Sequence, residues 1–418
     1  MPEEHGLPID ADGAGIDGMM PDAIDETPLS SVAQALVKSV SDLASDTDKR
    51  VYAVMDGSQF NDLPRLLKQA DVFHRPLYRF AGGDHAVIIG GPWLVNPYQA
   101  ALPHSSDRSS HDAAEGDVSD EDLEARSAAL SAQMVSSLKA GDPTGGGMLP
   151  SDEADPALVI ERLQKIISLS DQKPALMFWS GDNDFAAQDL YRHLRGMNTV
   201  RVPTSAKGDK NTRMPGAGDG RDIAVAGQED DSADTSSLRG YERVIFRHAD
   251  ANVMMQVIPV LDETQTAILF GPAEQIIFAP DATWGGGVKR ARQRDGVPQQ
   301  HGILTLSEQN IDAMADIRLE ASRRKRAALF RTSVPHLLEG LNDEEALVCM
   351  ERYEQQARTY GLRTERGFYQ WTYLMSASEG RFIQSPDIRD HLKGENPDKR
   401  LDEMMGFMAN AAMTGART

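Results

Sequence analysis

Short apolar runs and helix-like apolar stripes alternate along the first 303 residues. Runs of β-branched and aromatic residues are typical of buried strands, whereas apolar residues recurring every three or four positions indicate helices. Strands are predicted in this way at 50–56, 174–180, 198–202 and 241–247. Helices are predicted at 29–44, 63–70, 184–195 and 251–261. A further helix is predicted to begin after Asp155, its N-cap, with Pro156 in its first turn. Strands alternating with helices favour an α/β layer.

Two further segments combine an apolar run with a Gly-Pro turn. The segment HAVIIGGPWLV (85–95) predicts a strand broken by that turn, and TAILFGPAEQIIFAP (266–280) predicts a strand, a turn and a second strand. Both are expected to belong to the same layer.

After about residue 303 the strand pattern ends and helix signals replace it. Ser307 is expected to open a helix to about residue 331, and Asn342 with Glu345 resembles a capping box. Thr364 reads as the cap of a third helix, and Ser385-Pro386 and Asn396-Pro397 read as an N-cap followed by a first-turn proline. The predicted fold is therefore an α/β domain over 28–303, followed by an all-helical lobe over 304–418.

Three segments are too polar to predict any core. Residues 1–27 are rich in Gly, Asp and Pro and are expected to form a disordered tail. Residues 104–154 and 204–238 are rich in Ser, Asp and Gly, and we expect flexible acidic insertions in the α/β domain there.

The charge is unevenly distributed. The net charge of the 418 residues is −21, of which 305–418 carry −2 and 1–304 carry −19. An acidic surface repels phosphates, so neither nucleic acid nor anionic lipid is an expected partner, although acidic loops also serve solubility alone. The chain has no apolar run long enough to span a membrane, and it begins without a secretory pattern. A single cysteine, Cys349, fits a reducing compartment, and a cytoplasmic location is expected.

Candidate chemistry gathers in VIFRHADANVMMQ (244–256). Arg247, His248 and Asp250 follow an apolar run closely, as active-site residues do, and Asp56 ends the first predicted strand. One interpretation is a hydrolase that uses Asp56, His248 and Asp250. The other is structural: Asp250 stands where the N-cap of the next helix belongs, Arg247 pairs with it, and Asp56 caps a turn. His248 fits either interpretation, and no established catalytic motif, metal-ligand set or cofactor-binding loop is present.

The helical lobe carries a basic run and apolar stripes with open roles. The run RRKRAALFR (323–331) is either the solvated face of a helix or a docking patch for an acidic partner. Met and aromatic side chains in this lobe are either core or a surface that adapts to a partner. The candidates for partner binding are Phe368, Trp371, Tyr373, Leu401, Met404, Met405 and Met408.

Five short segments, spread over roughly 50–285, occur in the order in which one known family carries similar motifs. They are YAVMDGSQF (52–60), GGPWLV (90–95), LYRHLRGMNTVRV (190–202), FRHADANVM (246–254) and LFGPAEQI (269–276). In these segments the chain resembles the adaptor proteins, or effector chaperones, of bacterial type VI secretion. The motif positions, to which we assign structural roles, are Asp56, Gly91, Pro92, Arg247, Asp250, Gly271 and Pro272.

The resemblance implies a function that composition alone does not. It implies a cytoplasmic protein without catalytic activity, cofactor or metal. Such a protein binds the N-terminal region of a cognate toxic effector and helps load it onto the VgrG spike. It also implies that the helical lobe and the α/β lobe together form the effector cradle, where the Met and aromatic candidates above are expected to act. Neither nucleic acid binding nor membrane insertion is expected.

Overall fold

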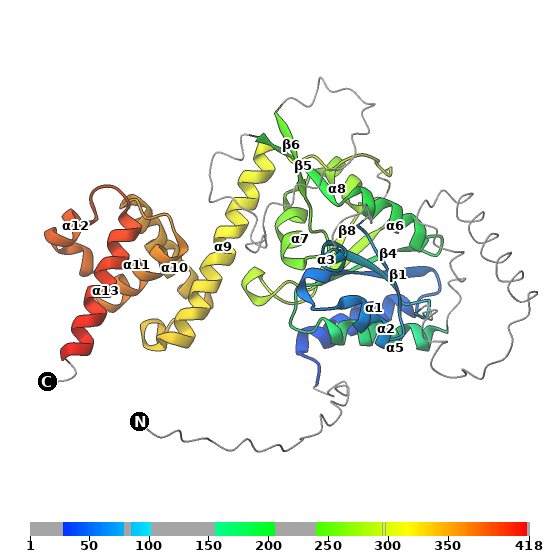
Figure 1. The fold of residues 1–418 in the computed structure, drawn as a ribbon, viewed down its shortest axis with the longest axis horizontal. Helices are drawn as coiled ribbons and strands as arrows, with labels where there is room; N and C mark the ends of the chain where they lie inside the picture. Colours follow the sequence, from blue (N-terminus) through cyan, green and yellow to red (C-terminus); the bar gives the residue numbers. More distant parts are fainter. Residues whose placement is uncertain are drawn as a thin grey trace, which may run out of the picture.

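A computed structural model describes residues 28–78, 85–101, 155–204, 240–294, 296 and 298–415. The predicted tail at 1–27 lies outside these residues, as do nearly all of the predicted insertions at 104–154 and 204–238. The chain forms an α/β lobe followed by a helical lobe, which confirms the predicted fold class (Figure 1).

The centre of the α/β lobe is a six-stranded sheet in the order β2-β3-β1-β4-β7-β8, with every neighbouring pair antiparallel. Its middle strands are apolar and buried because helices cover both faces. Figure 1 shows α1, α2 and α5 on one side of the sheet and α6, α7 and α8 on the other. The strands are β1 (Lys49–Asp56), β2 (Phe73–Pro76), β3 (Pro92–Asn96), β4 (Leu176–Asp182), β7 (Gln275–Phe278) and β8 (Lys289–Arg292).

Several helices of this lobe start at a side-chain cap. Ser30, Asp62 and Asp155 each accept a backbone N–H of the first turn that follows, and so satisfy a donor that the helix itself leaves free. The helices are α1 (Ser31–Ala44), α2 (Leu63–Gln69), α3 (His85–Ile89), α5 (Pro156–Leu169), α6 (Ala187–Gly196), α7 (Ala251–Val257) and α8 (Glu263–Phe270).

A separate two-stranded ribbon pairs β5 (Thr199–Pro203) with β6 (Tyr241–Ile245) in antiparallel fashion. The segment just before α9 lies along the other edge of β5, where Arg201 and Thr305 form a parallel bridge. The ribbon therefore lies beside the start of the helical lobe (Figure 1).

The helical lobe has its own apolar clusters, one around Trp371 and one around Phe330. Its first helix and the segment just before it join the two lobes: Leu304, Leu306 and the helical Met314 belong to the core of the α/β lobe, whereas Phe330, later in the same helix, lies in the helical lobe. The predicted caps at Ser307, Asn342 and Thr364 are present. The helices are α9 (Glu308–Ser333), α10 (Asp343–Thr359), α11 (Glu365–Ala377), α12 (Pro386–Leu392) and α13 (Pro397–Gly415).

Two predicted strands are wrong. Residues 85–89 form α3, and the first half of 266–280 lies in α8. Asp262 and Gln265 form a capping box that begins α8, and Gly271, at φ 54°, ends it. A short, continuous apolar run is compatible with a buried helix as well as with a strand, so its pattern did not decide the structure.

The two outer strands, β2 and β8, were not predicted. β2 includes His74, Arg75 and Pro76, and β8 reads Lys-Arg-Ala-Arg, so neither shows an apolar alternation. Both lie at the edges of the sheet, where proline and basic residues discourage pairing with another chain.

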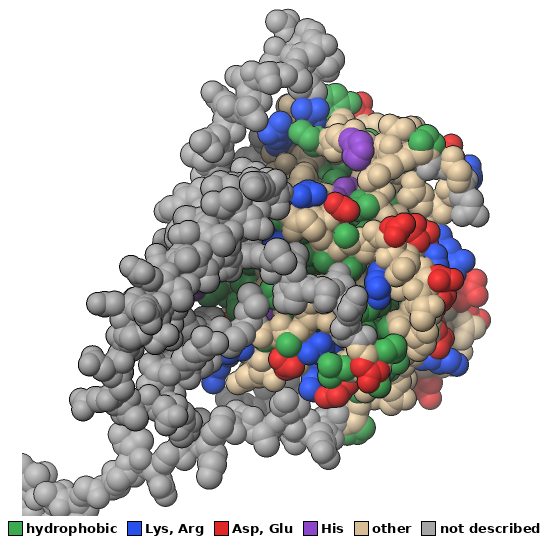
Figure 2. All heavy atoms as spheres, turned by 90° about the vertical axis from the view of Figure 1, so that its right-hand side faces the viewer, with side chains coloured by type: hydrophobic (Ala, Val, Ile, Leu, Met, Phe, Trp, Pro, Cys, Tyr) green, Lys and Arg blue, Asp and Glu red, His purple; other side chains and the backbone are tan. Residues whose placement is uncertain are grey.

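Acidic and basic side chains are intermixed on the face shown in Figure 2. Residues 1–27 and 102–154 each carry a net charge of −8, so most of the net −21 lies in these two segments, outside the described residues. The acidic character predicted for 1–304 is therefore concentrated in those segments.

Candidate functional site

Arg247 is the centre of a polar cluster that joins two segments distant in the sequence. It follows β6, and its guanidinium donates to the Asp56 carboxylate at the end of β1 and to the Ser58 hydroxyl at 2.7 Å. It also lies 3.5 Å from the Asp250 carboxylate. We call Asp56, Ser58, Arg247 and Asp250 the Arg247 cluster.

Both carboxylates of the cluster are also helix caps. Asp250 accepts the backbone N–H groups of Asn252 at 2.9 Å and Val253 at 3.3 Å and so caps α7, as predicted. Asp56 accepts the Ser58 N–H at 3.0 Å at the start of the 3-10 turn η1 (Gly57–Gln59). Arg247 therefore holds together two chain turns, one after β1 and one after β6.

Burial and charge oppose each other in this cluster. Burial tends to lower the pKa of Arg247, but the attraction of Asp56 and Asp250 outweighs it, so that pKa is raised. Burial also raises the pKa of Asp250, against the opposing attraction of Arg247. Two carboxylates share one guanidinium, and such an ion-pair network is the arrangement expected of a structural clamp.

The Gly91-Pro92 motif closes the same region. The Gly57 N–H donates to the Gly91 carbonyl at 2.9 Å, and Pro92 stands opposite Asp56 in the β1–β3 register. A Cβ atom at Gly91 would lie 2.4 Å from the Tyr78 ring, so a larger residue would displace that ring. A pocket of about 210 Å³ results, lined by Asp56, Ser58, Tyr78, Gly90, Pro92, Ile245, Arg247 and Ala249.

The Gly271-Pro272 motif lies beside a different residue, His193. A Cβ atom at Gly271 would meet the His193 ring at 2.4 Å, and the φ of 54° favours glycine independently. The Nε2 atom of that ring is 2.8 Å from the Leu269 carbonyl in α8. Gly271 thus allows α8 to end against α6, and its motif belongs to helix packing rather than to the Arg247 cluster.

His248 points into the core rather than toward the carboxylates. Its side chain is fully buried, its Nε2 atom lies 3.1 Å from the Asn198 Oδ1 atom, and its ring meets Phe246 edge to face. Burial lowers the pKa of His248 to about 3, so the ring is neutral. Asp56 and Asp250 are engaged by Arg247, and the three residues of the hydrolase interpretation do not converge on one reacting position.

The predicted partner-binding residues divide between core and surface. Phe368, Trp371 and Leu401 are buried in the cluster around Trp371, and Tyr373, Met404 and Met405 pack against it half-buried. Of the predicted set, Met408 is 46% exposed, and its neighbour Phe407 is 73% exposed. The buried three are core residues rather than a docking surface, and the apolar surface of α13 begins after Met405.

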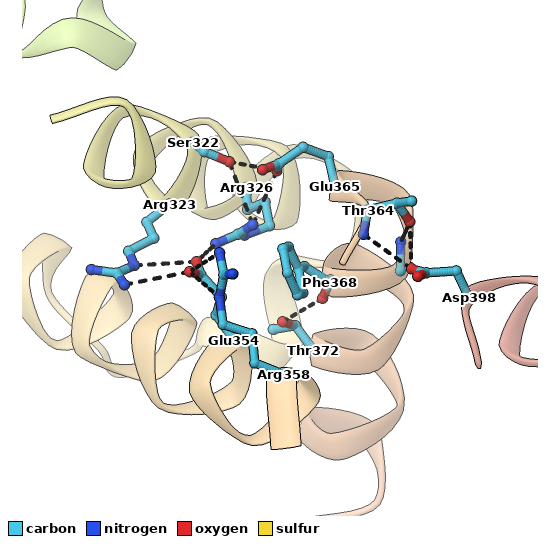
Figure 3. Close-up of polar contacts among 11 residues, drawn as sticks. Ser322, Arg323, Arg326, Glu354, Arg358, Thr364, Glu365, Phe368, Thr372 and Asp398 are labelled. Carbon is cyan, nitrogen blue, oxygen red and sulfur yellow. Dashed lines mark hydrogen bonds and ion pairs between the residues drawn. The ribbon is translucent and has the colours of Figure 1, made fainter. Parts of the chain in front are cut away.

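The basic run of α9 has a role that sequence reasoning missed. Glu354 of α10 is 1% exposed and accepts from Arg323 at 3.2 Å, from Arg326, and from Arg358 at 3.2 Å (Figure 3). Arg326 also reaches Glu365 of α11 at 3.0 Å. Neither the solvated-face nor the docking interpretation fits Arg323 and Arg326, which join three helices internally. The sequence signal was a glutamate, Glu354, on the apolar side of α10.

Comparisons of the chain with models of known protein families, with curated proteins and with solved structures found no match. The described residues contain no group of three or more His, Cys, Asp or Glu side chains placed to hold a metal ion. No helix in the described part of the chain combines the length and apolar character needed to cross a membrane.

Proposed function

We propose that this chain is a cytoplasmic, non-enzymatic adaptor of a type VI secretion system that binds a cognate effector and helps load it onto the VgrG spike. The observation that carries the proposal is the Arg247 cluster. Three of the five segments that resemble the adaptor family supply Asp56, Gly91-Pro92 and Arg247, and these residues meet around one structural clamp. Motif residues that support one another in this way suit a shared scaffold better than a chance match of short patterns.

A second support is the exposed end of the helical lobe. Phe407 and Met408 lie on α13, next to the half-buried Met404 and Met405. Methionine and aromatic side chains at an exposed helix end suit a groove that accepts an apolar helix of a partner. We therefore place the effector contact of the helical lobe at Phe407 and Met408, and assign Phe368, Trp371 and Leu401 to its support.

Co-expression with a candidate effector tests this function. The change is Phe407→Asp with Met408→Asp, and the matched control is Val348→Asp on α10, where Val348 is 61% exposed. A carboxylate buried unpaired against an apolar partner costs more than the roughly 2–7 kcal/mol of a neutral polar group, so captured effector is expected to fall at least about tenfold. Both variants are expected to melt as the unchanged protein does, because the altered side chains face solvent.

Two results would contradict the assignment. Normal capture by the folded double variant would move the contact away from α13. Failure of the unchanged chain to retain any effector encoded beside it would reject the adaptor function itself.

A further inference from the structure

The outer edge of β6 is open in the described structure. Among the described residues, β6 pairs with β5 alone. The other edge of β5 is occupied, because the Arg201 N–H donates to the Leu304 carbonyl and the Leu306 N–H donates to the Arg201 carbonyl, each at 2.9 Å. The ribbon can therefore accept a further strand at β6 but not at the middle of β5.

The register identifies which backbone groups point to this edge. The Phe246 N–H donates to the Asn198 carbonyl at 2.9 Å, and the Thr204 N–H donates to the Gly240 carbonyl at 2.7 Å. Hydrogen-bonded positions alternate along an antiparallel pair. The even-numbered residues of β6 consequently face β5, and the N–H and C=O groups of residues 241, 243 and 245 face outward.

The side chains of β6 protect its edge less than those of the two edge strands of the main sheet protect theirs. Tyr241 is 37% exposed and Ile245 is 55% exposed, with Arg243 exposed between them. The two edges of the main sheet differ: β2 ends in Pro76 and β8 carries three basic residues. Natural proteins use such residues to block edge pairing, whereas β6 has no proline and one basic residue, Arg243, between an exposed Tyr and an exposed Ile.

The charges on the ribbon indicate which side chains an added strand would carry. Arg243 stands opposite Arg201 in the ribbon, and no described carboxylate forms an ion pair with either. Like charges directly opposite one another on neighbouring strands are unfavourable. A second copy pairing β6 with β6 around Arg243 would add more arginines, whereas an acidic side chain would relieve the repulsion.

The pocket beside the Arg247 cluster lies at the end of the same edge. Ile245 lines it, with apolar walls from Tyr78, Pro92 and Ala249. In strand addition the main chain supplies affinity, and pockets for alternate side chains supply specificity. An apolar side chain opposite Ile245 lies next to this pocket.

We propose that the β6 edge binds an extended segment of a partner polypeptide by antiparallel strand addition. The segment carries an acidic residue opposite Arg243 and apolar residues opposite Tyr241 and Ile245, the latter beside the 210 Å³ pocket. This inference concerns how a strand is held, and it goes beyond the proposed adaptor function because it does not depend on the partner being an effector.

The probe is a fluorescein-labelled peptide, Ser-Val-Thr-Glu-Thr-Val-Ser, titrated with the full chain at low salt and followed by fluorescence anisotropy. Its core alternates apolar, polar and acidic residues in the required order. Replacing the central glutamate with lysine is expected to weaken binding at least about fivefold. Arg243→Glu is expected to reverse that preference, and Arg290→Glu, on the exposed edge strand β8, is the matched control that leaves it unchanged.

Backbone methylation separates strand addition from side-chain docking. N-methylation of the central glutamate blocks an N–H that points at β6 and is expected to weaken binding at least about tenfold. N-methylation of the threonine before it blocks an N–H that points away and is expected to leave binding within about twofold. Equal effects of the two methylations, or no binding of the unmodified peptide, would overturn the inference. Concentration-dependent self-association that Arg243→Glu abolishes would instead assign the edge to a second copy and would also overturn it.

Discussion

Replacing Glu354 with glutamine is expected to weaken the helical lobe severely. The Glu354 carboxylate is 1% exposed and receives hydrogen bonds from Arg323, Arg326 and Arg358. Arg326 is itself 4% exposed, and after Glu354→Gln its remaining ionic partner among the described residues is Glu365, whose side chain is 62% exposed. Removing one partner of a buried ion pair costs about 3–5 kcal/mol, because the remaining charge stays desolvated.

Urea unfolding of the full chain measures this loss, with Glu351→Gln as the matched control. Glu351 is 45% exposed and pairs with Arg323 alone among the described residues, so its loss is expected to cost less than about 1 kcal/mol. Replacing both Glu354 and Arg326 with leucine removes the pair together, and we expect it to recover much of the loss. Equal costs for Glu354→Gln and Glu351→Gln would refute the idea that the buried network holds the three helices together.

Glu354 is also expected to make the stability of the protein depend on pH in the acid range. Burial tends to raise the pKa of Glu354, but Arg323 and Arg326 outweigh it and hold that pKa below its usual value of 4.5. The unfolded chain therefore takes up a proton at a higher pH than the folded chain does. The stability supplied by Glu354 is present above pH 4.5 and is lost as the pH falls through the folded pKa, a dependence that Glu354→Gln is expected to remove.

Three further changes test the α/β lobe by denaturant unfolding. Asp250→Ala removes the α7 cap and is expected to cost about 0.5–2 kcal/mol; no loss would contradict the clamp. Because the pKa of buried His248 is about 3 against 6.5 in the unfolded chain, stability should fall by about 1.4 kcal/mol per pH unit as the pH drops between these values, and His248→Gln should flatten this slope. Gly271→Ala meets the His193 ring at positive φ and should cost more than about 1 kcal/mol, whereas Gly196→Ala, with open space in α6, should be neutral or stabilising.

Sequence reasoning predicted helices best where an N-cap residue is followed by apolar residues at helical spacing. Asp155, Ser307 and Asn342 each begin the helix predicted for them, because a cap is a contact between residues close in the chain. The same holds for Asp250 and its pairing with Arg247. The strand predicted over the first half of 266–280 was wrong because the apolar residues of α8 form one continuous run without a helical period. β8 was missed because an edge strand needs no apolar face.

Contacts between segments that are far apart in the chain could not be predicted from the sequence. The carboxylate of Asp56 is 191 positions from Arg247, and no local pattern pairs them. The roles of Glu354 and the buried state of Phe368 and Leu401 likewise depend on how α9, α10, α11 and α13 pack together. Apolar periodicity marks a helix face but does not say whether another helix of the same chain already covers it.

Secretion from a cell that lacks this chain tests the central claim most directly. The measurement is the amount of the cognate effector and of VgrG released to the medium, with and without the chain supplied in trans. The account predicts that removing the chain abolishes release of that effector and leaves VgrG release unchanged, because loading is lost while the spike is intact. Unchanged release of the effector in the absence of the chain would contradict the adaptor function.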